Sequence, residues 1–360
     1  MTHVSELVLI ANASDGTISS LRLHRGESPR LEVLTTTEGL TGCGTFAVDT
    51  RRDLVHAAYK GDPPGIATLR LNRETGELRE VSRRGVESSM TYLSLTAGGT
   101  LLLGASYGGN VGGTWPVRVD TEPDAGPDSQ PGLGEPVARI EHRNLHCVVP
   151  SDAPEGTDSA PTVAYFVALG DDLIAQYSVE SDGALTPLDP PTVAAPAGSG
   201  PRHLLLDGDN AYLVTEYSGE LIRFARGSDG ALSACESVVV VDPEQGLAHS
   251  RYGADPTQEH LIWGADVHRA GHWLVTSERS SSLLTVVACE GSGRLGDVVG
   301  YTPTQRQPRG FNVTDDGAFV VAVGEKSTDA ELFAVEDGGR LTSLGTAGIG
   351  HGANWVRILR

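Results

Sequence analysis

The sequence has no run approaching 18 consecutive apolar residues, and its first six residues, Met1 to Glu6, include no basic start followed by an apolar stretch. The first absence excludes a membrane-spanning helix, because such a helix needs about 20 apolar residues. The second absence argues against a secretory signal. We therefore expect a cytoplasmic protein that has no membrane partner.

Cysteine is scarce, and the four cysteines lie far apart with no Cys-x-x-Cys pair: Cys43, Cys147, Cys235 and Cys289. This spacing is typical neither of a zinc site nor of a disulfide framework, so we expect reduced, mostly buried thiols. The pairs His142/His146 and His268/His272 have the spacing of zinc ligands on a helix, but both lie in a strand or turn context. We therefore expect no metal and no cofactor.

Basic residues are outnumbered, with 27 Lys and Arg against 47 Asp and Glu and a net charge of −20. A protein this acidic is not expected to bind nucleic acid, which is itself an anion. Lys60 and Lys326 are the only lysines. The other basic residues are arginines, whose planar guanidinium matches carboxylate and phosphate groups. An anionic substrate would need a local basic pocket within this acidic protein.

The sequence has no long stretch with the 3.6-residue apolar periodicity of a helix, but it does contain an internal repeat. A polar turn containing glycine precedes a leucine and a short β-prone run, as in Glu74–Leu78 and Ser228–Leu232. The repeat leucines are Leu31, Leu78, Leu133, Leu185, Leu232, Leu295 and Leu341. They are spaced about 52 residues apart, a period that fits the four-stranded blade of a β-propeller. The sequence therefore predicts an all-β, seven-bladed β-propeller that forms a single domain over residues 1–360.

The two ends of the chain complement each other. The segment Asn354–Leu359 has the pattern of the first strand of a blade, and the segments Leu7–Ala11 and Ser19–Leu23 have the pattern of the next two. We predict that the N-terminal strands complete the last blade and close the ring, because closure removes the open edges of the sheets.

Three stretches break the repeat. Residues 120–137 and 151–161 are rich in Pro, Gly and Asp, which predicts surface loops. Residues 241–263 lengthen one interval of the repeat and carry His249, Arg251 and aromatic side chains. This longer stretch can fold over one mouth of the ring.

Charged and histidine side chains gather in and beside the segments that open the repeats. In a propeller these inner strands line the central channel, so their side chains converge near one axis. Charges buried there are costly unless they are paired or face a ligand. We therefore predict a basic pocket able to transfer protons, formed by His146, Arg202, His203, Glu216, Asp266, His268, Arg279 and Arg309. A non-enzymatic binding platform, the alternative at this point, would carry such residues on its outer faces.

Six segments also match the motifs of one protein family: Gly104–Val111, Gly200–His203, Ala265–His268, Glu278–Leu283, Gln307–Asn312 and Gly324–Ser327. In these segments the sequence resembles the seven-bladed β-propeller lactonase family. The resemblance implies a metal-independent hydrolase of a sugar lactone, foremost 6-phospho-D-glucono-1,5-lactone, which is opened to 6-phosphogluconate in the pentose phosphate pathway. It leaves open a lactonising cycloisomerase that acts on a carboxy-cis,cis-muconate.

The resemblance implies catalytic roles for His146, Arg202, Glu216 and Arg279, with His142 a competitor for the first. It implies substrate contacts for His203, Asp266, His268, Arg309, Tyr107 and Asn110. The chain departs from the family pattern at Tyr59-Lys60, where relatives often carry Glu or Arg.

Opening a lactone needs a base that takes a proton from water and a donor that stabilises the oxyanion. Glu216 or His146 would be the base, and Arg202 or Arg279 would be the donor. A structural alternative is an ion pair between Glu216 and Arg279. The expected partner is a small anionic lactone, and we expect a monomer because a closed ring needs no second copy.

Overall fold

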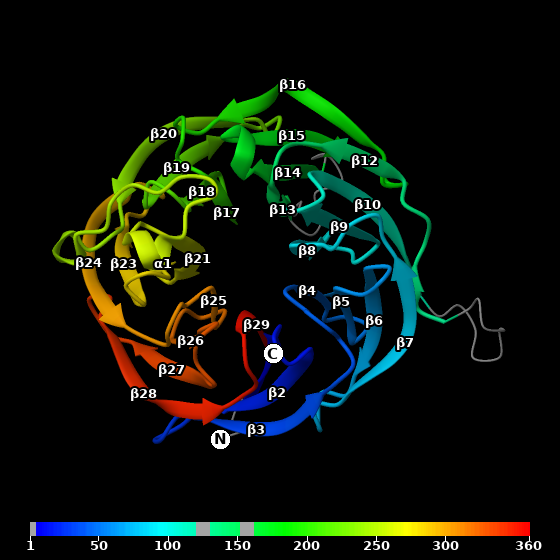
Figure 1. Ribbon diagram of the computed structural model, residues 1–360, viewed down its shortest axis with the longest axis horizontal. Helices are drawn as coiled ribbons and strands as arrows, with labels where there is room; N and C mark the ends of the chain where they lie inside the picture. Colours follow the sequence, from blue (N-terminus) through cyan, green and yellow to red (C-terminus); the bar gives the residue numbers. More distant parts are fainter. Residues whose placement is uncertain (1–4, 120–129, 152–161) are drawn as a thin grey trace.

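The computed structural model describes residues 5–119, 130–151 and 162–360. These residues form seven antiparallel sheets that are arranged as blades around a central channel (Figure 1). The predicted seven-bladed β-propeller is therefore confirmed. Most of the predicted loop at 120–137 and nearly all of the one at 151–161 lie outside the described residues.

The closing blade, blade 1, combines both ends of the chain. From the channel outwards, its strands are β29 (Ala353–Leu359), β1 (Ser5–Asn12), β2 (Thr17–His24) and β3 (Arg30–Thr37). Strands β29 and β1 pair antiparallel, with Leu9 opposite Arg357 and Ile10 opposite Val356. The predicted ring closure is therefore confirmed.

Blades 2 to 7 follow in chain order, each running outwards from the channel. Blade 2 has β4 (Phe46–Asp49), β5 (Leu54–Tyr59), β6 (Gly65–Leu71) and β7 (Leu78–Gly85), and blade 3 has β8 (Tyr92–Leu95), β9 (Leu101–Ser106), β10 (Val111–Arg118), β11 (Gly132–Leu133) and β12 (Ala138–Glu141). Blade 4 has β13 (Leu145–Pro150), β14 (Val163–Ala168), β15 (Leu173–Val179) and β16 (Leu185–Ala194). Blade 3 is irregular, because β11 and β12 both pair with β10.

The remaining three blades are regular. Blade 5 has β17 (Pro201–Asp207), β18 (Asn210–Thr215), β19 (Glu220–Arg226) and β20 (Leu232–Val239). Blade 6 has β21 (Gly264–Ala270), β22 (Trp273–Glu278), β23 (Leu283–Cys289) and β24 (Leu295–Pro303), and blade 7 has β25 (Gly310–Val313), β26 (Phe319–Val323), β27 (Asp329–Val335) and β28 (Leu341–Gly348). All seven repeat leucines lie at the first or second residue of a blade's outer strand.

The turn glycine of the repeat contacts the blade before it. Gly76 has a φ of +75°, and a Cβ atom there would lie 2.8 Å from Cβ of Ser20 in blade 1. The Ser20 hydroxyl donates a hydrogen bond of 2.7 Å to the Gly76 carbonyl. Tyr165 of blade 4 donates in the same way to Gly230 of blade 5, over 2.5 Å. The repeat therefore requires glycine both for its backbone conformation and for close approach between blades.

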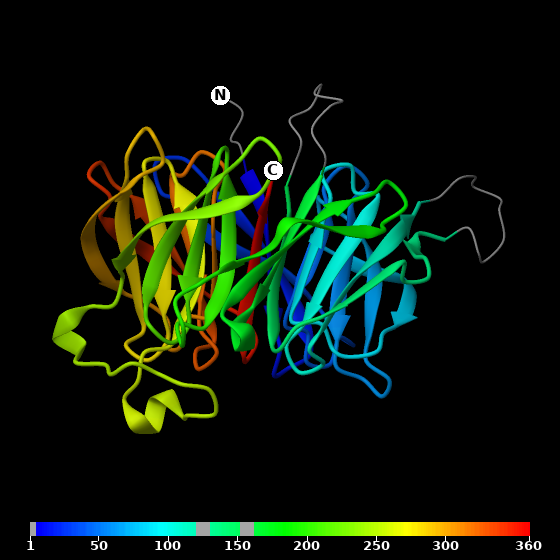
Figure 2. The ribbon, with the colours of Figure 1, turned by 90° about the horizontal axis from the view of Figure 1, so that it is seen from above.

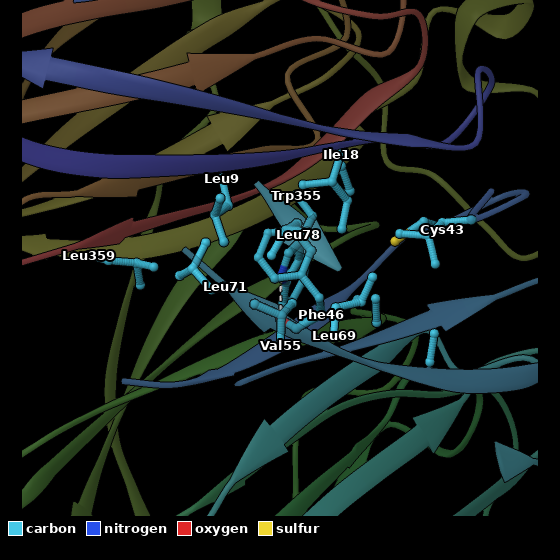
Figure 3. Packing of buried hydrophobic residues seen from close by; sticks show 14 of the residues in the cluster. Leu9, Ile18, Cys43, Phe46, Val55, Leu69, Leu71, Leu78, Trp355 and Leu359 are labelled. Carbon is cyan, nitrogen blue, oxygen red and sulfur yellow. Dashed lines mark hydrogen bonds between the residues drawn. The ribbon is translucent and has the colours of Figure 1, made fainter. Parts of the chain in front are cut away.

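Each blade has two apolar faces because it is packed between two neighbours. Along β1, alternate side chains point to opposite faces. Leu9 packs with Phe46 and Val55 of blade 2 (Figure 3), whereas Ile10 packs with Val321 of blade 7. This arrangement explains why β1 is apolar at nearly every position rather than at every second one.

The longer stretch 241–263 connects β20 to β21 and stands out from one face of the ring (Figure 2). It contains the turn η3 (Pro243–Gln245) and the helix α1 (Pro256–Glu259), and the third helical turn of the described residues is η2 (Leu169–Asp171). None of the helices in the described ranges has the length and apolar character to cross a membrane.

Candidate active site

Two cavities occupy the channel. Cavity A, of about 500 Å³, is lined by His146, Glu216, Trp263, Arg279, Arg309 and Glu325, among others. Cavity B, of about 360 Å³, is lined by His203, Asp266, His268, Arg226, Trp355 and Arg357, among others. Along β13, His146 lines cavity A and Val149 lines cavity B. Along β29, Asn354 lines cavity A and Arg357 lines cavity B. The cavities therefore lie at opposite ends of the inner strands.

Aromatic and imidazole rings lie between the two cavities. The His203 ring centroid is 5.1 Å from that of His146, 5.2 Å from that of Tyr92 and 6.0 Å from that of Trp355. Tyr92 and Trp355 also meet edge to face, with centroids 4.8 Å apart. These packed rings lie between His146, which lines cavity A, and the part of the channel that forms cavity B.

A buried ion triad forms one wall of cavity A. Oε2 of Glu216, which follows β18, accepts hydrogen bonds from Nε of Arg202 (2.9 Å) and from a terminal nitrogen of Arg279 (2.8 Å). Arg202 and Arg279 are only 1% and 3% exposed. Burial opposes ionisation of Glu216, but Arg279 and Arg202 outweigh it and lower the pKa of the carboxyl group. Burial, with Arg279 nearby, lowers the pKa of Arg202 to about 9.

Arg279 is fixed by the end of the 241–263 stretch. Its guanidinium lies 3.8 Å from the centre of the Trp263 ring, and its Nε donates to the Trp263 carbonyl over 3.3 Å. The carboxylate of Glu278 accepts from the backbone amides of Trp263 (2.7 Å) and Ser281 (2.6 Å) and so ties this turn to β22. The end of the long stretch thus contributes Trp263 to the lining of cavity A.

His146 lines cavity A and has a ring nitrogen that is not hydrogen-bonded to any described residue. It is 4% exposed, and its Nδ1 atom is buried without a hydrogen-bond partner among the described residues. Burial, with Arg202 and His203 nearby, lowers its pKa well below the usual range. The imidazole is therefore neutral at neutral pH, and its ring meets Tyr107 edge to face at 5.8 Å.

The structure separates the residues that the sequence predicted as one site. His146, Glu216, Arg279, Arg309 and Tyr107 line cavity A. Arg202 lies behind Glu216 and lines neither cavity; besides Glu216, it donates to the Ala265 carbonyl. The competitor His142 lies beside Asp171, at 3.3 Å.

The other four predicted substrate contacts lie away from cavity A. His203, Asp266 and His268 line cavity B, where Nδ1 of His203 lies 2.7 Å from Asp266. Nε2 of His268 is 3.4 Å from Asp266 but makes no hydrogen bond. Asn110 has a positive φ of 58° in the turn before β10, and its side-chain oxygen accepts from the Asn144 amide over 2.7 Å.

Three charged or aromatic lining residues of cavity A were given no role from the sequence. Glu325 accepts a hydrogen bond of 3.0 Å from Arg309. Glu325 lies in Gly324–Ser327, one of the six segments that match the family motifs, so the sequence offered a reason to include it among the site residues. Trp263 stacks on Arg279, and Lys60 lies on the rim. In the described ranges no group of three or more His, Cys, Asp or Glu side chains could hold a metal ion, and the cysteines are free thiols.

Buried neutral histidines predict acid sensitivity. Burial lowers the pKa values of His56 and His203 to about 4, and it also lowers that of His146. Between about pH 6.5 and pH 4 the unfolded chain binds protons at these residues and the folded chain does not. The free energy of unfolding should therefore fall as pH decreases through this window, by about 1.4 kcal/mol per pH unit for each histidine.

Urea unfolding of the His56→Gln variant between pH 7 and pH 5 checks this expectation. His56 lies outside both cavities and contacts Thr68 at 3.1 Å. The variant should lose stability less steeply with acid than the parent protein. The matched control is His272→Gln, an exposed position, which should keep the parental slope. Equal slopes in all three proteins would contradict the expectation.

The chain was compared with known proteins. Residues 7–358 match the family model described as "Lactonase, 7-bladed beta-propeller". A 6-phosphogluconolactonase of Serratia proteamaculans is 29% identical over 364 residues, which cover 99% of each chain. A 6-phosphogluconolactonase of Sodalis glossinidius is 28% identical over 300 residues, which cover 82% of each.

Solved structures share the fold. A periplasmic gluconolactonase of Pseudomonas aeruginosa superposes with a TM-score of 0.80 at 22% identity, and the match covers 99% of each chain. A protein of Lactobacillus plantarum also gives 0.80, at 21% identity, over 99% of this chain and 100% of the other. The fold and the family model agree along almost the entire sequence. The chain therefore belongs to the seven-bladed β-propeller lactonase family.

Proposed function

We propose that this protein hydrolyses 6-phospho-D-glucono-1,5-lactone to 6-phosphogluconate without a metal ion, with cavity A as its active site. Its relatives in Serratia and Sodalis carry the name 6-phosphogluconolactonase. The observation that carries the proposal is the unpartnered, neutral His146 in the same cavity as Arg279 and Arg309. This set combines a base with two cationic donors, which is what ester hydrolysis requires.

In the proposed reaction, His146 takes a proton from a water molecule as the water oxygen attacks C1 of the lactone. The negative charge that develops on the carbonyl oxygen is stabilised by the guanidinium of Arg279 or Arg309. The bond between C1 and the ring oxygen then breaks, and the ring oxygen takes the proton back from His146. The lowered pKa of His146 favours this second step, because the protonated ring gives up its proton more readily, and it makes the neutral ring a weaker base in the first step.

Arg202 acts in this scheme as a positioning residue rather than as a catalytic one. It is buried behind Glu216 and holds the carboxylate that in turn holds Arg279. Oε2 of Glu216 is already engaged, because it accepts hydrogen bonds from both Arg202 and Arg279, whereas Nδ1 of His146 has no partner among the described residues. The proton transfer is therefore assigned to His146 and the orientation of Arg279 to Glu216.

The test is the rate of lactone opening by the purified protein against the spontaneous rate. Freshly generated 6-phosphogluconolactone is followed through formation of 6-phosphogluconate, with and without EDTA. Acceleration that survives EDTA is the expected result. No acceleration would overturn the proposed substrate, and acceleration with a carboxymuconolactone instead would favour the cycloisomerase. Acceleration that EDTA abolishes would overturn the metal-independent reaction.

A further inference from the structure

The cations of cavity A are not equally free to bind a substrate. Arg202 and Arg279 share Glu216, and Arg309 is paired with Glu325. Lys60 also lines the cavity, and no carboxylate of the described residues lies within salt-bridge distance of it. Lys60 is thus the lining cation whose charge remains available to an anion.

The lining of the cavity carries a net positive charge and so favours an anion. Arg279, Arg309 and Lys60 contribute three positive charges, and Glu216 and Glu325 contribute two negative charges, which leaves one positive charge. Because the two glutamates are paired with arginines, the uncompensated charge is that of Lys60. A phosphate monoester, with about −1.5 to −2 charges at pH 7, is the kind of anion that it can attract.

The backbone holds Lys60 against a glycine turn. The Lys60 amide donates to the Thr41 carbonyl over 2.7 Å. Gly42 has a φ of +63°, and a Cβ atom there would lie 2.9 to 3.0 Å from three carbons of the Lys60 side chain. Glycine at position 42 lets the lysine stem lie along this turn, and both residues line cavity A.

Two hydroxyl groups line the same cavity. Ser88 and Ser89 belong to the connection from blade 2 to blade 3. The Ser88 hydroxyl lies 3.0 Å from the Ser106 hydroxyl, which also lies 2.8 Å from the Ser89 carbonyl; because Ser106 has one proton, it donates to only one of these two oxygens. Ser89 has no side-chain hydrogen bond among the described residues. Serine hydroxyls beside an ammonium group are common ligands of phosphate oxygens.

We propose that Lys60, together with the hydroxyls of Ser88 and Ser89, binds the phosphate group of the substrate. This inference rests on the proposed lactonase function for its substrate and adds a specificity residue to it. The lactone ring then lies towards His146 and Arg279, and the phosphate lies towards the rim. Selection of phosphorylated over unphosphorylated lactones follows from this arrangement.

The experiment compares KM for 6-phosphogluconolactone with KM for glucono-1,5-lactone in the full chain. Lys60→Met should raise the first by roughly 5- to 20-fold more than the second, because an exposed ammonium group is partly screened by solvent. Lys60→Arg should restore most of the preference. The matched control is Lys326→Met, which removes the other lysine of the chain; Lys326 lines a neighbouring hollow that shares Trp263 and Glu325 with cavity A.

Equal changes of KM for the two lactones in Lys60→Met would overturn the phosphate site, as would an equally large effect of Lys326→Met. Failure of the proposed function is recognised separately, because the wild-type protein would then open neither lactone. In that case calorimetry compares the binding of 6-phosphogluconate and gluconate. Preference for the phosphorylated compound that Lys60→Met abolishes supports the site, and absence of any preference overturns it.

Discussion

Replacement of His146 by alanine should lower kcat for lactone opening by roughly 10²- to 10⁴-fold, the usual contribution of general acid–base catalysis. His146 lines cavity A and has a ring nitrogen without a partner among the described residues, whereas the lining carboxylates of Glu216 and Glu325 are paired with arginines. KM should change much less, because the arginines and Lys60 remain in place. Steady-state kinetics at pH 7, with the spontaneous rate subtracted, measures both constants.

His142→Ala is the matched control for this variant. His142 lies four residues earlier, pairs with Asp171 and does not line cavity A. It should keep near-normal turnover and a similar melting temperature. If His142→Ala lost activity while His146→Ala kept it, the assignment of the base would be wrong. Near-normal turnover in both variants would point to Glu216 as the base.

Replacement of Glu216 by glutamine should cost about 3 to 5 kcal/mol in the free energy of unfolding. The substitution keeps the shape of the side chain but removes the charge that neutralises both Arg202 and Arg279. These guanidinium groups are almost fully buried, so solvent cannot compensate the loss. Urea unfolding at pH 7 gives the difference.

The comparison for this variant is Glu259→Gln. Glu259 pairs with Arg251 at 2.7 Å, but both side chains are exposed, and such pairs contribute about 1 kcal/mol or less. A loss in Glu216→Gln no larger than that in Glu259→Gln would show that the triad does not stabilise the fold. Retained stability with lost activity would instead place Glu216 mainly in catalysis.

The repeat made the fold predictable. In blades 2 and 4 to 7 a glycine with positive φ stands two residues before the repeat leucine, and at Gly76 and Gly230 the neighbouring blade leaves no room for a Cβ atom. This requirement recurs with the period of the blade and is visible in a single sequence. The closure of the ring was predictable in the same way. The C-terminal segment has the pattern of the first strand of a blade and the N-terminal segments have that of the strands that follow, and β29, β1, β2 and β3 form one sheet.

The grouping of the site residues was predictable only in part. The inner strands were identified correctly, but each of them passes through the whole channel. Arg202 and His203 are adjacent in sequence, yet Arg202 contacts Glu216 at the wall of cavity A and His203 lines cavity B. Neighbouring residues on a strand point in different directions, and which end of the channel each one reaches depends on the tilt and packing of the blades.

The sequence by itself determined the seven blades, the closure of the ring and the family, because these depend on periodic local requirements repeated along the chain. The tertiary structure decided which charges remain free. Pairing of Arg202 and Arg279 with Glu216, and of Arg309 with Glu325, joins residues that are 14 to 63 positions apart. It leaves Nδ1 of His146 and the charge of Lys60 without a partner among the described residues, since pairing in a cavity depends on distances in space.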